Sequence, residues 1–397
     1  MDNPMSSPSH IQTIQQTLRD LDIDAWLFFD HHQRDPIAYQ VLNLELNQMA
    51  SRRWYYLIPK EGEPQLLVHR IESKILDSLP GQKHIYSGWR THQEGLATLL
   101  FGLKRVAMQY SPGCAIFYVS MVDAGTIELI RSFGPEIVSS ADLVQIFNAT
   151  LTQAHIDSHL AAGVKMDALR RAAFADVSSA LANNRTLTEY QLQCWVRQGM
   201  EREGLFTDHG PIVAVNAHAA DPHYEPSEAS ALPIRPNDFL LLDMWAKLTT
   251  PGAVYYDITW TGFCGTAVPT EMDNVFNIVA AARDAAFNRA KAARESASIL
   301  HGFEVDDAAR EVITAAGYGD YFVHRTGHSI TQDIHGTGAN MDNLETHDVR
   351  QVMPNTIFSV EPGIYLEHFG LRSEFDVLAK ADTAIVTGEI QQSLIRL

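Results

Sequence analysis

The segment LLLDMWAKLTTPGAVYYDITW, residues 240–260, decides the fold of the C-terminal part of this chain. Apolar and β-branched residues dominate both of its ends, and LTTPGA at 248–253 has the composition of a turn. The segment therefore predicts two buried strands that pair as a hairpin. Each strand carries one aspartate, Asp243 and Asp257. Two neighbouring buried carboxylates repel each other strongly unless a cation lies between them.

Three more polar side chains interrupt apolar segments further along the chain. His328 lies in RTGHSIT, Glu361 in FSVEPGIY and Glu374 in LRSEFDV, and Gly327 lets the backbone approach closely beside His328. Each is ambiguous alone, because a single buried acid or histidine is often only structural. Four carboxylates and one imidazole together suit two neighbouring divalent cations better than one structural zinc. Such a pair can activate water at neutral pH, so a metallohydrolase is the leading hypothesis.

Length and composition limit the class of protein. The 397 residues predict two domains, and 46% hydrophobic with 20% charged residues is ordinary for a soluble globular chain. The net charge of -18 argues against nucleic-acid and anionic-membrane partners. Three widely spaced cysteines fit neither a disulfide framework nor a cysteine-based zinc site. Because MDNPMSSPSH lacks a signal-peptide pattern and no apolar run approaches about 20 residues, we expect a cytoplasmic protein.

The periodicity of the sequence predicts an α/β domain over 1–152 and an α+β domain over 153–397. In the first domain, strands and helices alternate, with strands at 25–29, 54–59, 65–70, 84–89 and 105–110 and helices at 10–21, 71–79, 92–103 and 120–133. In the second, a long helix over 153–184 and a helix with a Thr188–Gln191 capping box precede the hairpin. Helices at 271–297 and 305–316 and strands around 358–366, 371–379 and 384–388 follow.

These segments resemble the M24 metallopeptidases of the pita-bread fold, which include methionine aminopeptidases, prolidases and Xaa-Pro aminopeptidases. Residues 243–262 resemble that family's two-aspartate hairpin, 324–328 its Gly-His segment, 358–365 its Ser-Val-Glu-Pro-Gly-Ile-Tyr segment and 371–376 its Val-Arg-x-Glu segment. The likeness is strongest to the Xaa-Pro branch and spans 155–390. The first 150 residues resemble the creatinase-like N-terminal domain only loosely.

The resemblance implies a dinuclear metal site and a reaction. Asp243 would bind one metal, Asp257 and Glu374 would bridge both, and His328 and Glu361 would complete the other's ligands. The two ions would be Mn, Co, Zn or Fe, about 3.5–4 Å apart. A hydroxide bridging the metals would attack the scissile carbonyl, with Glu361 as the proton shuttle.

The resemblance also implies roles for residues around the metals. His223 and His335 would take part in catalysis, by contacting the substrate and by steadying the tetrahedral intermediate. His218 lies near His223 in the sequence, but Pro222-His223 fits the family pattern better. The other expected substrate-binding residues are Trp245, Tyr224 and His324, and hydrogen-bond partners of the ligands are expected at Thr259 and Arg372.

Four departures from the family pattern surround the expected metals without removing a ligand. Asp243 and Asp257 are three residues further apart than usual, and the extra length falls in the turn. Trp245 replaces a usual glycine, Gly336-Thr337 replace an acid and a proline after His335, and Asn355 replaces a common glycine. The identity of the substrate therefore does not follow from the metal ligands.

Three functions are consistent with the sequence. The first is a dinuclear peptidase for Xaa-Pro bonds, acting as a dipeptidase or an aminopeptidase on small peptides. The second is a non-peptidase on the same fold, namely a metal-dependent lyase or an amidohydrolase for a small molecule. The third is a non-catalytic binding protein, which is disfavoured because all five ligand types are present. The resemblance further implies a homodimer.

Overall fold

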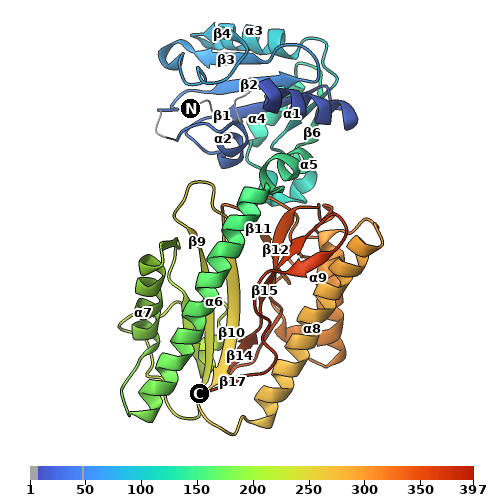
Figure 1. Cartoon of the computed structure of the whole chain (residues 1–397). Helices are drawn as coiled ribbons and strands as arrows, with labels where there is room; N and C mark the ends of the chain where they lie inside the picture. Colours follow the sequence, from blue (N-terminus) through green and yellow to red (C-terminus); the bar gives the residue numbers. More distant parts are fainter. Residues whose placement is uncertain (1–7, 47–48) are drawn as a thin grey trace. The chain divides into compact units, whose positions relative to one another are not determined.

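The computed structural model describes residues 8–46 and 49–397 (Figure 1). Residues 1–7, which belong to the stretch where we expect no targeting signal, lie outside the described part. The chain divides into two compact units, Met1–Asn148 and Ala149–Leu397. No helix in 8–46 or 49–397 is long and apolar enough to cross a membrane.

The N-terminal unit is a six-stranded mixed sheet covered by helices on both faces. The strand order is β4-β3-β2-β1-β5-β6, with β1–β2 and β2–β3 antiparallel and the other pairs parallel. The strands are β1 (Ala25–Asp30), β2 (Trp54–Pro59), β3 (Gln65–His69), β4 (Gln82–Tyr86), β5 (Arg105–Met108) and β6 (Glu136–Ser139). The helices are α1 (Pro8–Asp20), α2 (Pro36–Leu42), α3 (Trp89–Leu100), α4 (Ala124–Arg131) and α5 (Ala141–Val144).

Alternation along β1 explains the two layers of helices. Trp26 and Phe28 join the apolar cluster beneath α1 and α2, whereas Leu27 and Phe29 join the cluster beneath α3 and α4. The helix expected at 71–79 is wrong, because only one 3₁₀ turn, Arg70–Glu72, forms there. Ile71 is exposed, so this stretch has no continuous apolar face to bury as a helix.

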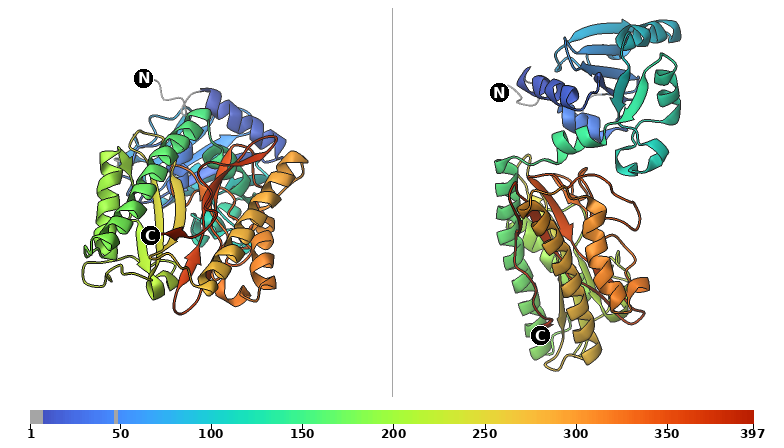
Figure 2. Two further views of the ribbon diagram at one scale, coloured as in Figure 1. Left: turned by 60° about the horizontal axis from the view of Figure 1, so that its bottom comes forward. Right: turned by 90° about the vertical axis from the view of Figure 1, so that its right-hand side faces the viewer.

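The C-terminal unit is α+β, with pairs of helices that flank central strands, as expected for a pita-bread fold (Figure 2). Its strands are β7 (Leu205–Phe206), β8 (Ile212–Val215), β9 (Phe239–Leu248), β10 (Tyr256–Phe263), β11 (Ser329–Ile330), β12 (Thr356–Val360), β13 (Gly363–Tyr365), β14 (Gly370–Arg372), β15 (Phe375–Ala379), β16 (Ala384–Val386) and β17 (Ile395–Arg396). Its helices are α6 (Gln153–Ala182), α7 (Glu189–Arg202), α8 (Thr270–Glu295) and α9 (Gly302–Ala315).

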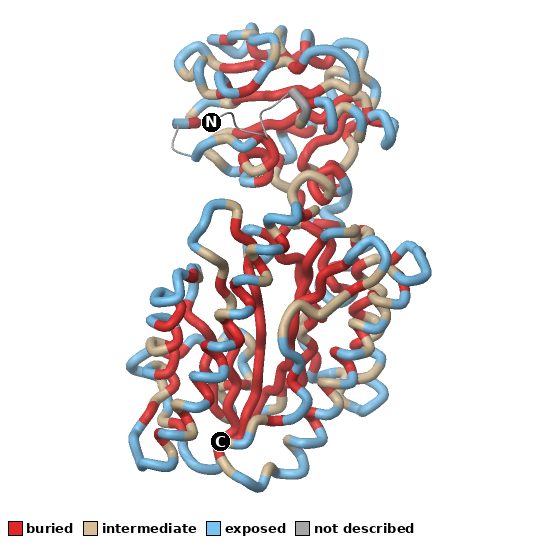
Figure 3. Tube along the Cα trace, viewed as in Figure 1, coloured by how far each residue is buried: buried red, intermediate tan, exposed pale blue. Residues whose placement is uncertain are grey.

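The strands of this unit form three sheets. One contains β17-β10-β9-β7 with β8 also paired to β9, the second is β11-β12-β15-β16, and the third is the pair β13-β14. Residues of α6 and α7 pack on one side of β9 and β10, and residues of α8 and α9 pack on the other side and against β12 and β15. Buried residues therefore follow the central strands (Figure 3).

Helix α6 is continuous through Gly163, and packing against Tyr256 explains why this position is a glycine. A Cβ at Gly163 would lie 2.7 Å from the ring of Tyr256, so the missing side chain allows the helix to lie close against β10. The helix begins with a side-chain cap from Thr152, whose hydroxyl accepts a hydrogen bond from the backbone of His155.

Candidate metal centre

The hairpin of β9 and β10 places the two aspartates on one face of the sheet. The strands are antiparallel, with Asp243 opposite Thr259 and Trp245 opposite Asp257. Alternate residues of a strand point to the same side, so these four side chains share a face. The pairing of the two strands confirms the predicted hairpin, and the additional residues lie in the connection between β9 and β10.

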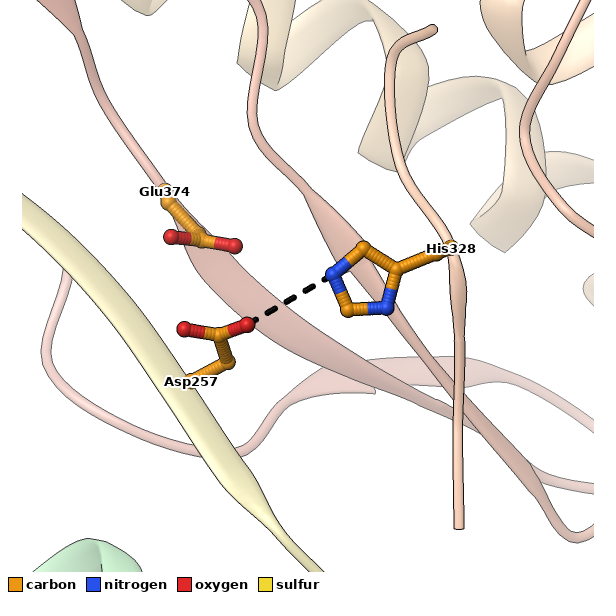
Figure 4. Close-up of side chains that lie close together, drawn as sticks. All are labelled: Asp257, His328 and Glu374. Carbon is orange, nitrogen blue, oxygen red and sulfur yellow. Dashed lines mark ion pairs between the residues drawn. The ribbon is translucent and has the colours of Figure 1, made fainter. Parts of the chain in front are cut away.

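Three candidate ligands from separate parts of the chain meet in one buried cluster. Asp257 lies on β10, His328 directly precedes β11, and Glu374 lies between β14 and β15. One ligand atom of each residue lies within 4.8 Å of the others (Figure 4). His328 Nε2 is 3.5 Å from Asp257 Oδ2. Glu361, immediately after β12, extends the cluster, with its Oε1 atom 3.4 Å from His328 Nε2.

Arg372 connects Asp243, the fifth candidate ligand, to this cluster. Its Nη2 atom donates a close hydrogen bond to Asp243 Oδ2, and its Nε atom lies 3.7 Å from Glu361 Oε2. The same Nε donates to Thr259 Oγ1 at 3.0 Å, and the Thr259 hydroxyl donates to Glu374 Oε2 at 2.7 Å. Arg372 and Thr259 therefore touch three of the acids and restrict their orientations.

The electrostatics of the cluster fit a divalent cation. Burial raises the pKa of Asp257, and the charges of Asp243 and Glu361 raise it further. Burial and then the charge of Asp257 likewise raise the pKa of Glu374. Within the described part of the chain, Asp257 Oδ1 and Glu374 Oε1 are buried and accept no hydrogen bond. Oxygen atoms that are crowded, buried and unpartnered are the ligands that hard cations take.

His328 offers the cluster a ring nitrogen that burial keeps neutral. Burial lowers the pKa of His328, although the neighbouring Glu361 opposes this shift. A neutral imidazole is the form that binds a metal. The backbone around it is fixed by Ser359, whose Oγ accepts from His328 N at 3.0 Å and whose N donates to His328 O at 2.9 Å. A Cβ at Gly327 would lie 1.9 Å from Ser359 O, so this close approach requires the glycine.

The sequence profile of metallopeptidase family M24 matches residues 159–381, which contain every candidate ligand. The chain belongs to metallopeptidase family M24. The profile thus covers the hairpin, the His328 segment and both glutamate segments of this M24 chain.

Known relatives of this M24 chain agree with that assignment. A Mycoplasma pneumoniae protein, named provisionally as an Xaa-Pro aminopeptidase, is 32% identical over 201 residues, which are 49% of this chain and 51% of the relative. The Xaa-Pro dipeptidase of Lactobacillus helveticus is 26% identical over 61% of this chain and 60% of its own. The chain thus matches these curated relatives over about half to three-fifths of their length. The crystal structure of dipeptidase PepE from Mycobacterium ulcerans shares the fold, with a TM-score of 0.75 and 21% identity over 100% of this chain and 99% of that one.

Two histidines lie beside the metal cluster of this M24 chain. The rings of His335 and His328 meet edge to face, with centroids 4.5 Å apart. Repulsion between the two imidazoles in their protonated forms, followed by burial, lowers the pKa of His335 to about 3. The exposed His223 lies close enough to lower the pKa of His335 further. His335 therefore contacts the candidate ligand His328, and His223 lies within electrostatic range of His335.

The other expected substrate-binding side chains of the M24 chain already have partners within the protein. The Tyr224 hydroxyl donates to Glu189 Oε2 at 2.9 Å. His324 Nε2 lies 2.7 Å from the Tyr365 hydroxyl, and its segment is not helical. The half-buried Trp245 lies directly across from Asp257 and donates from Nε1 to Asp208 Oδ1 at 3.0 Å.

Asp376 and Glu189 are two buried acids of the M24 chain that were not expected to be functional from the sequence. Asp376 Oδ2 accepts a hydrogen bond from the backbone N of Asp257 at 2.8 Å, and Asp376 is fully buried. Its signal was the one used for the ligands, an acid inside the apolar strand FDVLA. Glu189 is also fully buried, but an acid in the first turn of a helix ordinarily indicates only a solvated, dipole-favoured position.

Proposed function

We propose that this chain is a metal-dependent peptidase that hydrolyses Xaa-Pro bonds, in dipeptides or at the N-termini of peptides. The observation that carries the proposal is the buried cluster of Asp257, His328 and Glu374, whose carboxylates retain unpartnered oxygens, in a member of metallopeptidase family M24. The relatives named for Xaa-Pro substrates support the choice of bond.

Two divalent ions, of Mn, Co, Zn or Fe, fit the five candidate ligands. Asp257 and Glu374 each have one buried oxygen without a hydrogen bond and would hold both ions. Asp243 would complete the ligands of one ion, and His328 with Glu361 those of the other. When bound, the ions supply Lewis-acid polarisation of the scissile carbonyl and a water that is nucleophilic at neutral pH.

Glu361 and the two histidines are the groups that handle protons and substrate. Glu361 is the most accessible of the four acids, with 17% of its side chain exposed, so it can exchange a proton with a reacting group. His335 is neutral over the working pH range because its pKa is lowered to about 3, so its ring N–H can donate to a developing oxyanion. His223, exposed beside it, would contact the peptide.

Trp245 favours a second candidate function, a metal-dependent lyase or amidohydrolase acting on a small molecule. The indole shares the face of the ligands and lies directly opposite Asp257, so it limits the space beside the ions. A smaller, non-peptide substrate would be favoured by this restriction. The homodimer and the cytoplasmic location expected from the sequence stay predictions.

A substrate panel on metal-defined protein tests the proposal. The chain would be stripped with a chelator, reloaded with Mn²⁺, Co²⁺ or Zn²⁺, and assayed on Xaa-Pro dipeptides, longer Xaa-Pro peptides, matched Xaa-Ala peptides and small-molecule amides. We expect hydrolysis of Xaa-Pro over Xaa-Ala, with about two metals per chain. Full activity after exhaustive chelation would refute the metal mechanism. Turnover of non-peptide substrates alone would establish the second candidate.

A further inference from the structure

Glu189, the first residue of α7, is a fully buried carboxylate that accepts hydrogen bonds from four groups. Its Oε1 accepts from Val215 N at 2.8 Å, and its Oε2 accepts from Leu232 N at 2.7 Å and from the Tyr224 hydroxyl at 2.9 Å. His218 Nδ1 lies 3.0 Å from both oxygens. Burying a carboxylate is costly, and charge-assisted hydrogen bonds of this number compensate for it.

The four donors all belong to one segment, residues 215–232. Val215 and Leu232 are its two ends, and the other two donors lie inside it. The backbone adds a further link, because Glu189 N donates to Leu232 O at 3.0 Å. The capping box of Thr188 and Gln191 fixes the start of α7 itself, so the carboxylate is held on a rigid element. Glu189 therefore closes the segment into a defined loop.

This loop carries His223 and rests on the strand that leads to Arg372. The carbonyl oxygen of Ala219 lies so close to β14 that a Cβ at Gly370 would be only 2.0 Å from it. His223 lies four residues further along the same loop, at an exposed position within electrostatic range of His335. No side chain of α7 is among the candidate ligands, so Glu189 acts on the site indirectly, through the loop or through β8, which ends at Val215 and pairs with β9.

We propose that Glu189 is a positioning residue of this site, whose buried carboxylate fixes the 215–232 loop and so places His223 beside His335. The kinetic part of this proposal rests on the proposed peptidase function. The competing explanation is that Glu189 stabilises the fold in general, with no specific effect on His223.

Glu189→Gln separates these explanations with little change in volume. The amide nitrogen must face either the N–H of Val215 or that of Leu232, so one hydrogen bond of the loop is replaced by a repulsive contact. We expect kcat/KM for an Xaa-Pro peptide to fall about 10- to 100-fold, with the bound metal unchanged. Hydrogen–deuterium exchange should rise in 216–231 but not in β9 or β10. The control is Glu201→Gln, an exposed residue of the same helix.

A double-mutant cycle with His223→Ala identifies the route of the effect. If Glu189 acts through His223, the double variant loses no more activity than His223→Ala alone. Losses that multiply would overturn the proposal, as would wild-type rates and exchange in Glu189→Gln. If that variant does not fold, Tyr224→Phe removes one of the four donors and should give a smaller effect in the same direction. If the wild-type chain has no Xaa-Pro activity, the proposed function fails. Hydrogen–deuterium exchange of 216–231 in Glu189→Gln still tests whether Glu189 fixes the loop.

Discussion

Glu374 has the most restricted side chain among the candidate ligands. One carboxylate oxygen accepts from Thr259 at 2.7 Å, while the other is buried and unpartnered beside Asp257. The backbone N of Glu374 also donates to the Thr259 carbonyl at 3.2 Å. One oxygen of Glu374 is therefore held by Thr259, and the other is left without a hydrogen bond in the buried cluster with Asp257 and His328.

Glu374→Gln should remove metal and activity without removing volume. The substitution deletes the negative charge that a bridging ligand needs, so the metal content should fall. The turnover number kcat should drop by at least about 100-fold, since even partners that only orient a metal ligand cost 10- to 100-fold. Metal analysis and steady-state rates at fixed added Mn²⁺ measure both effects. Glu367→Gln, at an exposed position nearby in the sequence, should match wild type. Near-normal rates in the Glu374 variant would contradict the assignment.

His335→Asn tests a residue that lies beside the metals without being a ligand. Its ring packs edge to face on His328 and, being neutral, can donate to charge that develops on the substrate. We expect kcat to fall by about 100- to 1,000-fold while the metal content stays unchanged. Loss of metal in this variant would show that His335 supports His328 instead.

At the residue scale, the sequence indicates the candidate ligands more clearly than the residues that support them. The five candidate ligands are identifiable because each is polar inside an apolar segment. Arg372 and Thr259 were expected as ligand partners, and the structure gives both of them hydrogen bonds to the acids. Glu189 gave no such signal, because its burial depends on a loop that folds over the start of α7.

At the element scale, periodicity located the helices and the longer strands of the C-terminal unit to within a few residues, but it missed the two-residue strands β7, β11 and β17, and each of the segments 358–366 and 371–379 forms two strands. The helix expected at 153–184 is α6, Gln153–Ala182, and the hairpin strands pair as predicted. The helix expected at 71–79 failed because isolated apolar residues there do not form one face. The segment 322–327, which no helix or strand was expected to include, is irregular: Gly327 N donates to the Met341 carbonyl, and His324 Nε2 lies 2.7 Å from the Tyr365 hydroxyl, so both residues pair with distant segments of the chain.

His159 gives α6 a pH-dependent attachment to the strands. Its Nδ1 lies 2.6 Å from the Tyr255 carbonyl and its Nε2 lies 2.8 Å from Thr387 Oγ1, and burial lowers the pKa of His159 to about 4. The unfolded chain, with a histidine pKa of about 6.5, binds the proton more readily. The stabilisation is therefore fully present above pH 6.5 and is lost as the pH falls toward 4, by at most about 3 kcal/mol.

His159→Gln should remove this pH dependence while keeping one donor and one acceptor. We expect the variant to be less stable than wild type at pH 7 and the difference to shrink as the pH falls to 4.5. Urea unfolding of chelated protein at both pH values measures the free energies of unfolding. His368→Gln, at an exposed histidine, should leave the pH dependence unchanged. An unchanged difference between wild type and His159→Gln would contradict the pKa assigned to His159.

At the scale of the whole molecule, every candidate ligand belongs to the C-terminal unit. The candidate ligands extend from Asp243 to Glu374 and come from both strands of the hairpin and from the segments next to β11, β12 and β15. Ions bound by all of them would connect separate sheets of this unit. The N-terminal unit contributes none of the five.

Metal removal should consequently destabilise one unit and not the other. A free metal concentration 100 times the Kd stabilises the folded state by about 2.7 kcal/mol per site. We expect calorimetry to show a lower Tm for the C-terminal unit after chelation, restored by Mn²⁺, with hydrogen exchange in the N-terminal unit unchanged. Equal protection by Mn²⁺ in Glu374→Gln would mean that the ions bind elsewhere.

The register of β9 and β10 determines where the hairpin can accept an insertion or a deletion. Insertion or deletion of one residue inside either strand would turn one aspartate to the opposite face of the sheet. Such a shift in register would therefore separate the two carboxylates. The connection is free of this constraint, and Thr250 and Pro251 are exposed at its tip. Insertions and deletions in close homologues should therefore occur at 249–252. An epitope inserted there should leave the candidate metal site unchanged.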